Sequence, residues 1–328
     1  MKTVIVIVGP TATGKTEVAI RLAKKLNGEI ISADSRQIYK YMDIGTNKPN
    51  GKWSRQCGTN GKRQYVVNEI YHHLIDIINP DENFSAGNFV ELANKKINEI
   101  FDRGKTPLIV GGTGLYIKAL IDGLIKIPKS DERLRLRLNK FYKTRGIEYL
   151  YSMLEKLDSE TAKTIDRQNP VRVLRALEIC LLTGKKFSEL KKQTKKSEYK
   201  YVLFGLKADR NKLYGRINDR VDKMVKTGLI TEVKKLIKKY ATSKNTILQN
   251  TIGYSEIIKF LNGKLSKKEA IDLIKQNTRH YAKRQMTWFS ARGGFASGGN
   301  KDKQIIWIDS ENNPSKKILT LLEMGEKL

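Results

Sequence analysis

Residues 4–8 read Val-Ile-Val-Ile-Val, and the next eight residues are Gly9-Pro10-Thr11-Ala12-Thr13-Gly14-Lys15-Thr16. Five consecutive β-branched residues predict a strand that is buried on both faces. The loop that follows matches the phosphate-binding pattern G-x-x-x-x-G-K-[ST] at every fixed position. Apolar residues then recur at helical spacing, at Val18, Ala19, Leu22, Ala23 and Leu26. A buried strand, a glycine loop and a helix predict an α/β fold, a P-loop NTPase-like parallel sheet flanked by helices.

The glycine loop is suited to holding a diphosphate or triphosphate. Its glycines let backbone N–H groups turn inward, and the following helix presents its positive N-terminal end to the anion. Lys15 adds a positive charge, and the Thr16 hydroxyl can be a ligand of Mg²⁺. The motif identifies the group that is held and leaves the reaction open.

The chain is strongly basic. Its 328 residues include 63 Lys and Arg against 34 Asp and Glu, which gives a formal net charge of +29. This excess favours a polyanionic partner such as nucleic acid, although a lysine-rich composition with solvated helix faces is the alternative. Two cysteines and three histidines are too few and too scattered for a disulfide framework or a metal cluster. No run approaches the ~18 apolar residues of a membrane span, so we expect a cytoplasmic protein.

A second predicted strand, residues 29–34, ends in Asp34. The carboxyl ends of parallel strands share one edge of a sheet, so we expect Asp34 to face the phosphate loop. An acid at this distance could instead bind the ribose of a dinucleotide, but the loop lacks the three-glycine fingerprint. A third strand, residues 107–110, ends in Gly111-Gly112-Thr113-Gly114, where a nucleotide hydrolase would normally place an acid that orients Mg²⁺.

The periodicity of the sequence predicts three regions. Residues 1–125 form the first part of a catalytic core, with a polar, glycine-dotted flap at 50–70. Residues 126–198 lose the strand signal and form an inserted helical domain, in which Val171, Leu174, Leu177 and Leu181 make one apolar stripe. Residues 199–328 return to the core through a strand at 201–206 and include basic C-terminal helices.

Two arginine pairs are candidates for phosphate contacts. Arg216 and Arg220 are four apart on a predicted helix and are expected to project together, or else to pair with nearby acids. Arg172 and Arg175 are three apart and either hold phosphates or pair with an acid such as Glu178. Residues 278–289 form a basic helix with interleaved aromatic residues, which is typical of a surface that contacts a nucleic-acid backbone.

Several short motifs occur together in a fixed order. They are the phosphate loop, Asp34-Ser35-x-Gln37-x-Tyr39, Asp43-Ile44-Gly45-Thr46, Gly111-Gly112-Thr113, Arg216-x-x-x-Arg220, Gly253-Tyr254 and Lys283-Arg284-Gln285-x-Thr287-Trp288. With these motifs the chain resembles the tRNA dimethylallyltransferase family (IPP transferases) from residue 4 to about residue 290. One departure is the segment at 50–70, which is about twice as long as is usual in that family.

The resemblance implies transfer of a dimethylallyl group from dimethylallyl diphosphate to N6 of the adenine immediately 3′ of the anticodon in tRNA. It implies Mg²⁺ as cofactor, the anticodon stem-loop as partner, and a monomer. Asp34 would accept the N6 proton, while Thr11, Arg220, Lys15 and Thr16 with Mg²⁺ would hold the diphosphate together with the rest of the loop from Gly9 to Thr16. The resemblance assigns tRNA contacts to Asp34, Ser35, Arg36, Gln37, Thr113, Thr164, Ile165, Asp166, Arg167, Gln168, Arg172, Arg279, Lys283 and Arg284.

Two other functions are compatible with the loop and the charge. A small-molecule kinase would use the loop for ATP and would need no tRNA. A non-catalytic RNA-binding protein would use the basic surface alone, and Asp34→Asn would then be silent.

Overall fold

The computed structural model describes residues 2–54, 63–123, 125, 131–193, 197–240, 246–290, 295 and 304–325. The chain divides into two compact units: the first comprises Met1–Ile121 and Glu198–Leu328, and the second comprises Asp122–Ser197. The limits expected for the inserted segment, 126 and 198, lie close to the ends of the second unit. Each unit is described by itself below.

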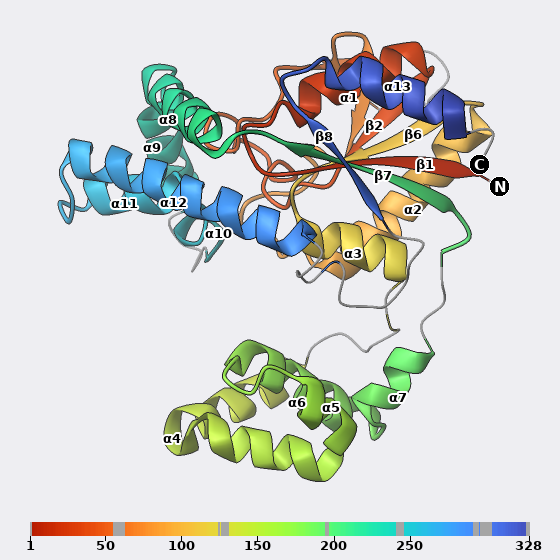
Figure 1. Cartoon of the computed structure of the whole chain (residues 1–328). Helices are drawn as coiled ribbons and strands as arrows, with labels where there is room; N and C mark the ends of the chain where they lie inside the picture. Colours follow the sequence, from red (N-terminus) through yellow and green to blue (C-terminus); the bar gives the residue numbers. More distant parts are fainter. Residues whose placement is uncertain are drawn as a thin grey trace. The chain divides into compact units, whose positions relative to one another are not determined.

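An eight-stranded sheet forms the centre of the first unit, with the strand order β3-β4-β5-β2-β6-β1-β7-β8 (Figure 1). The central strand β1 (Thr3–Val8) lies parallel to β6 (Thr106–Val110) and to β7 (Lys200–Lys207). The remaining parallel strands are β2 (Gly28–Ser32), β5 (Ile70–His73) and β8 (Ile305–Asp309). The predicted α/β fold with a flanked parallel sheet is confirmed.

The predicted flap at 50–70 is wrong for the residues that the structure describes. β3 (Lys52–Ser54) pairs with β4 (Gln64–Val67), and β4 pairs with β5, both in antiparallel fashion, so the two strands extend the edge of the sheet. Trp53 packs edge-on against Tyr65, with 5.5 Å between ring centroids. Strands this short carry a weak periodic signal, which is why the sequence reads as a loop. Residues 55–62 lie outside the described part of the chain.

Helices cover both faces of the sheet because its strands are apolar on both sides. Val4, Val6 and Val8 pack with α2 (Ala86–Asp102) and α3 (Gly114–Asp122). Ile5 and Ile7 point to the opposite face and pack with α1 (Lys15–Lys25) and α13 (Pro314–Gly325). The alternation follows from the two-residue period of a strand. Figure 1 shows α1 and α13 on one side of the sheet and α2 and α3 on the other.

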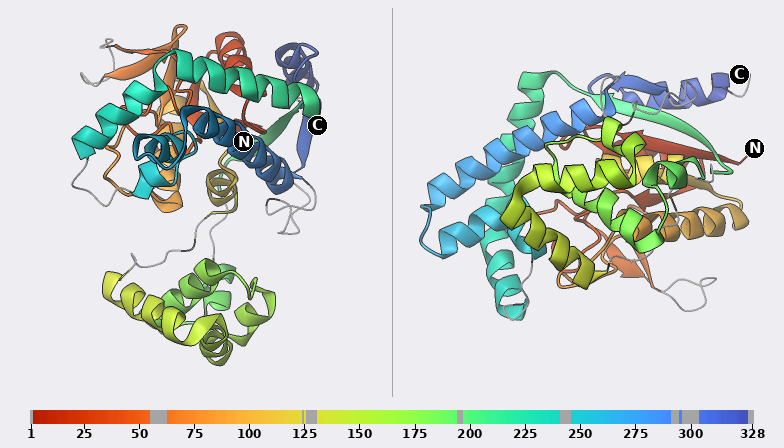
Figure 2. Two further views of the ribbon diagram at one scale, coloured as in Figure 1. Left: turned by 90° about the vertical axis from the view of Figure 1, so that its left-hand side faces the viewer. Right: turned by 90° about the horizontal axis from the view of Figure 1, so that it is seen from below.

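A further group of helices belongs to the first unit. It consists of α8 (Arg210–Lys226), α9 (Leu229–Tyr240), α10 (Thr246–Gln249), α11 (Tyr254–Leu261) and α12 (Lys267–Phe289). α8 and α12 pack against each other, and their ribbons can be followed in Figure 2. Ile38 and Met42, from the loop after β2, are buried in the apolar core of this group. The loops at the carboxyl end of the sheet are thereby joined to the helices.

The second unit consists of α4 (Glu132–Leu157), α5 (Ser159–Thr164), α6 (Pro170–Thr183) and α7 (Phe187–Lys192). The predicted stripe on α6 is wrong at two positions, because Val171 is 73% exposed and Leu181 is 43% exposed. The buried face carries Val173, Ala176, Leu177 and Cys180 instead. α6 has apolar residues on most of its circumference, so periodicity alone cannot choose between neighbouring faces.

Among the described helices, none combines the length and the apolar character that crossing a membrane requires.

Candidate active site

The phosphate loop connects β1 to α1. Gly9 has a φ of +137° and lies against β7, where a Cβ atom would be 2.5 Å from the Leu206 carbonyl oxygen. Gly14 and Ala12 have left-handed backbone angles, with φ of +80° and +66°. The Thr13 hydroxyl donates to the Pro10 carbonyl at 2.9 Å and closes the loop. Left-handed residues within a loop of this kind turn N–H groups toward a common anion site.

Lys15 extends back over this loop. Its Nζ donates to the Pro10 carbonyl oxygen at 2.6 Å. Burial and the nearby Arg220 guanidinium lower the Lys15 pKa to about 7, against the opposing attraction of Asp34. An anion in the loop would favour the charged form of Lys15, so the side chain is poised to exchange a carbonyl for a phosphate oxygen.

Arg220 is directed at the loop from α8. Its Nη1 donates to the Thr11 hydroxyl at 2.7 Å, and burial lowers its pKa while Asp34 raises it. Arg216, one turn earlier, does not join it: its Nη2 pairs with the Glu311 carboxylate at 3.1 Å. The prediction that the two arginines project together is wrong, because an acid in the turn after β8 draws Arg216 away.

Asp34 follows β2 in a tight turn. Its Oδ1 accepts the N–H of Arg36 at 2.8 Å and that of Gln37 at 3.4 Å. The negative charge of Asp34 raises the pKa values of both Lys15 and Arg220. The carboxylate therefore lies near the two cations at the phosphate loop. In the described part of the chain, Oδ2 accepts no hydrogen bond, so this oxygen is available to a substrate.

The neighbouring candidate residues are bonded to one another. The Thr113 hydroxyl accepts the N–H of Ser35 at 3.0 Å. Burial raises the pKa of Tyr281 to about 12, so this phenol stays protonated at neutral pH. The Gln37 side-chain amide donates to the carbonyls of Thr46 and Asn47, at 3.4 and 3.3 Å.

Gln285 is a central residue that sequence reasoning left without a role. Its Oε1 accepts the N–H of Thr11 at 2.8 Å, and its Nε2 donates to the Gly112 carbonyl at 3.0 Å. A Cβ atom at Gly112 would lie 2.0 Å from that Nε2, so a glycine is needed there. Helical spacing in the sequence could have pointed to Gln285, because it lies on the buried face of α12 together with Ala282 and Phe289.

One cavity of about 300 Å³ in the first unit lies beside the phosphate loop. Thr11, Asp34 and Arg220 line it together with apolar side chains from the helices, Val221, Met224, Ile252 and Ile274. Its other lining residues include Ser35, Arg36, Gly45, Thr46, Asn47, Gly253, Thr278, Tyr281 and Arg284. A cation-rich clamp beside apolar side chains can hold an anionic head with a short hydrocarbon tail.

The remaining candidates lie outside that cavity. On α12, Arg279 donates to the Asn218 side chain at 2.8 Å, and Lys283 is exposed. The second unit carries Thr164–Gln168 from the last residue of α5 onward, and there Arg167 pairs with Glu148 and stacks on Tyr151. Arg172 is exposed at the start of α6. Its neighbour Arg175 pairs with buried Glu178 at 2.8 Å, as the alternative interpretation expected.

The fold and the site define a class of α/β protein in which a glycine loop of the phosphate-binding pattern lies beside a carboxylate. Residues 37–292 match the family model described as IPP transferase. A tRNA dimethylallyltransferase of Acetivibrio thermocellus is 43% identical over 98% of this chain and 97% of that relative. The chain belongs to the IPP transferase family.

Two solved structures are also similar. The full-length tRNA isopentenylpyrophosphate transferase of Bacillus halodurans is 39% identical to this chain, with a TM-score of 0.66. The match covers 100% of this chain and 96% of the Bacillus halodurans chain. A eukaryotic dimethylallyltransferase described as acting on tRNA is 29% identical, covers 98% and 79% of the two chains, and has a TM-score of 0.80. These relatives share the fold over nearly the whole chain.

Proposed function

We propose that this chain is a tRNA dimethylallyltransferase, which moves the dimethylallyl group of dimethylallyl diphosphate to N6 of the adenine immediately 3′ of the anticodon. The observation that carries the proposal is the single cavity in which Thr11 and Arg220 meet Asp34. A phosphate clamp and a carboxylate then face the same apolar space. This is the arrangement that displacement of diphosphate by an amine requires.

On the nucleophile side, Asp34 accepts the proton. The N6 amine is weakly nucleophilic because its lone pair is delocalised into the purine ring, so it needs a base or an orienting acceptor. The Arg36 and Gln37 N–H groups hold Oδ1, which leaves Oδ2 to face N6. As the N6–carbon bond forms and the carbon–oxygen bond breaks, the N6 proton passes to Oδ2. The adenine must first leave the anticodon loop stack to reach this position.

On the leaving-group side, negative charge develops on the bridging oxygen of the diphosphate. Lys15, in the loop, and Arg220, on α8, would stabilise that charge, and the hydrogen bond from Arg220 to the Thr11 hydroxyl supports a role for Thr11 in the same group. Preorganised cations of this kind stabilise a transition state because they need no reorganisation during the reaction.

The residues present fit a Mg²⁺ ion that is bound mainly by substrate. Among the described residues, no group of three or more His, Cys, Asp or Glu could hold a metal. Thr16, the second residue of α1 and half-buried, offers one hydroxyl. Mg²⁺ commonly takes its other ligands from phosphate oxygens and water. When bound, the ion would neutralise part of the diphosphate charge.

We assign the tRNA contacts that the family resemblance implies. Ser35 and Arg36 line the cavity beside Asp34, and Thr113 is bonded to Ser35, so these residues and Gln37 would meet the extruded adenine. Arg279, Lys283 and Arg284 of α12 would meet backbone phosphates. In the second unit, Thr164–Gln168 and Arg172 would contact the anticodon loop.

The test is incubation of the full chain with dimethylallyl diphosphate, Mg²⁺ and unmodified tRNA, followed by mass analysis of the nucleosides. We expect a dimethylallylated adenosine next to the anticodon and an equal amount of released diphosphate. An unmodified nucleoside pool, together with tight ATP binding and weak dimethylallyl diphosphate binding, would overturn the proposal in favour of a kinase.

A further inference from the structure

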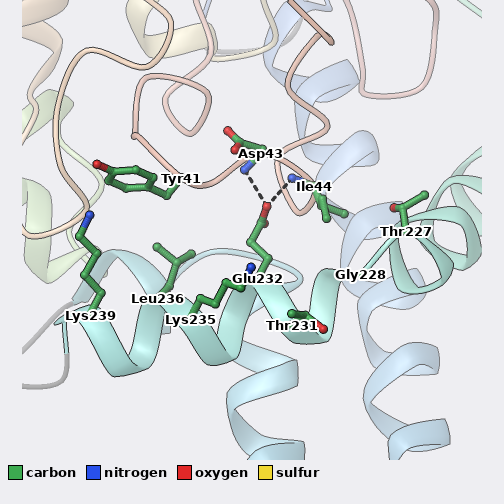
Figure 3. Close-up of a pocket in the computed structure, with 10 residues that line it drawn as sticks. All are labelled: Tyr41, Asp43, Ile44, Thr227, Gly228, Thr231, Glu232, Lys235, Leu236 and Lys239. Atoms are coloured by element: carbon green, nitrogen blue, oxygen red, sulfur yellow. Dashed lines mark hydrogen bonds between the residues drawn. The ribbon is translucent and has the colours of Figure 1, made fainter.

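Glu232 of α9 holds a turn that belongs to another part of the chain (Figure 3). Its Oε2 accepts the N–H groups of Asp43 at 3.0 Å and Ile44 at 2.7 Å. Its Oε1 accepts the N–H of Gly45 at 3.0 Å and the hydroxyl of Tyr254 at 2.6 Å. One carboxylate therefore fixes three consecutive backbone amides and a buried phenol.

The same turn leads directly into the wall of the catalytic cavity. Gly45, Thr46 and Asn47 line that cavity, and the Gln37 amide holds the last two by their carbonyls. The far end of the segment is fixed by Lys48, whose buried Nζ lies 2.6 Å from carboxylate oxygens of both Asp43 and Asp76. This wall segment is thus held at both ends, by Glu232 at its start and by Lys48 at its end.

The turn that Glu232 fixes also packs against a second segment of the cavity wall, at Gly253. A Cβ atom at Gly45 would lie 2.4 Å from Cε2 of Tyr254, so the turn and the ring are in direct contact. Tyr254 is fully buried and follows Gly253, which also lines the cavity. Burial and the Glu232 carboxylate raise the pKa of Tyr254 well above its usual value, so the phenol remains a donor.

Only a carboxylate satisfies this set of donors. Both oxygens of Glu232 accept two hydrogen bonds, and the four donors compensate its charge. A glutamine keeps one acceptor oxygen and turns an NH₂ group toward donors, so half of the set would be left unpaired.

We propose that Glu232 is a positioning residue for prenyl transfer. It fixes the turn at Asp43–Gly45 and thereby the cavity wall at Gly45–Asn47, against which the two reactants are aligned. The inference rests on the proposed function, because it assigns the wall to the alignment of the adenine and the allylic carbon.

The test compares Glu232→Gln with Glu82→Gln in the full chain. Glu82 is a matched control because its carboxylate also accepts a backbone N–H, that of Asn79 at 2.6 Å, in a turn that does not line the cavity. We expect Glu232→Gln to lower the single-turnover rate at saturating substrates by about 10²-fold, since a small misplacement of reactants has effects of this size. Its affinity for tRNA should match that of the control. Its unfolding temperature should be lower, because two donors lose their acceptor, while the protein stays folded at the assay temperature.

Two further measurements separate positioning from folding. Hydrogen exchange of the amides of Asp43, Ile44 and Gly45 should quicken in Glu232→Gln and stay slow in Glu82→Gln. Tyr254→Phe removes one donor and keeps the three amides bonded, so its rate loss should be smaller than that of Glu232→Gln.

The proposal is overturned if Glu232→Gln transfers the prenyl group at the wild-type single-turnover rate, or if Glu82→Gln loses as much rate. It is also overturned if the loss in Glu232→Gln lies entirely in tRNA affinity. Failure of the proposed function is a distinct result, because the wild-type chain would then form no dimethylallylated nucleoside while the exchange of the three amides would still report on Glu232.

Discussion

At the scale of a single residue, Lys15 has a pKa that is unusually low for a lysine. Burial and Arg220 hold its pKa at about 7, so its amine is largely neutral at slightly alkaline pH. A diphosphate in the loop attracts the charged form and raises this pKa. Below pH 7 the ammonium is already charged and binding takes up no proton at this group. Above that pH, binding must be accompanied by proton uptake.

We therefore predict that the affinity for dimethylallyl diphosphate falls as pH rises above about 7, approaching tenfold per pH unit. Titration calorimetry in buffers of different ionisation enthalpy measures the protons taken up. Lys15→Arg is the control, since a guanidinium stays charged across this range. Equal proton uptake by both proteins, or none by the wild type, would contradict the account of Lys15.

At the scale of elements, α12 packs so closely on the turn after β6 that this turn requires glycines. A Cβ atom at Gly114 would lie 2.0 Å from Cδ1 of Trp288, whereas Gly215 in α8 has no such neighbour within 4 Å. We predict that Gly114→Ala lowers the free energy of unfolding by about 1–3 kcal/mol through overpacking. Gly215→Ala should raise it by about 0.5–1 kcal/mol, because alanine is the better helix former.

Urea unfolding midpoints measure both changes. An unchanged or raised free energy of unfolding in Gly114→Ala would show that α12 yields to the added methyl group, and that the contact with Trp288 is not tight.

Elements with strong local signals could be predicted from the sequence, and contacts between distant residues could not. The run at 4–8 and the pattern that follows it identify β1, α1 and the glycine loop between them, because burial on both faces leaves no polar position in the strand. The edge strands β3 and β4 were missed because they are short. Gln285 and Glu232 were missed because their partners, Thr11 and Asp43, are far away in the sequence.

At the scale of the whole molecule, a net charge of +29 is large enough to dominate the binding of a polyanion. We predict that the affinity for tRNA falls steeply with salt, by about 10³-fold or more between 50 and 200 mM if six or more phosphates are contacted. Lys283→Ala should reduce the slope of log K against log salt by about one. Lys234→Ala, on the exposed side of α9, should leave it unchanged.

Filter binding across a salt series gives both slopes. A flat response would show that the charge excess is a matter of composition and that tRNA is held by other contacts.

The most direct test of the account is the single-turnover rate of Asp34→Asn with tRNA and dimethylallyl diphosphate both bound. Asparagine can keep the turn bonds to Arg36 and Gln37 while it loses the ability to take a proton. We predict wild-type affinity for tRNA and a rate that is lower by about 10²–10⁴-fold. An unchanged rate would contradict it, because the carboxylate beside the phosphate clamp would then have no part in the transfer.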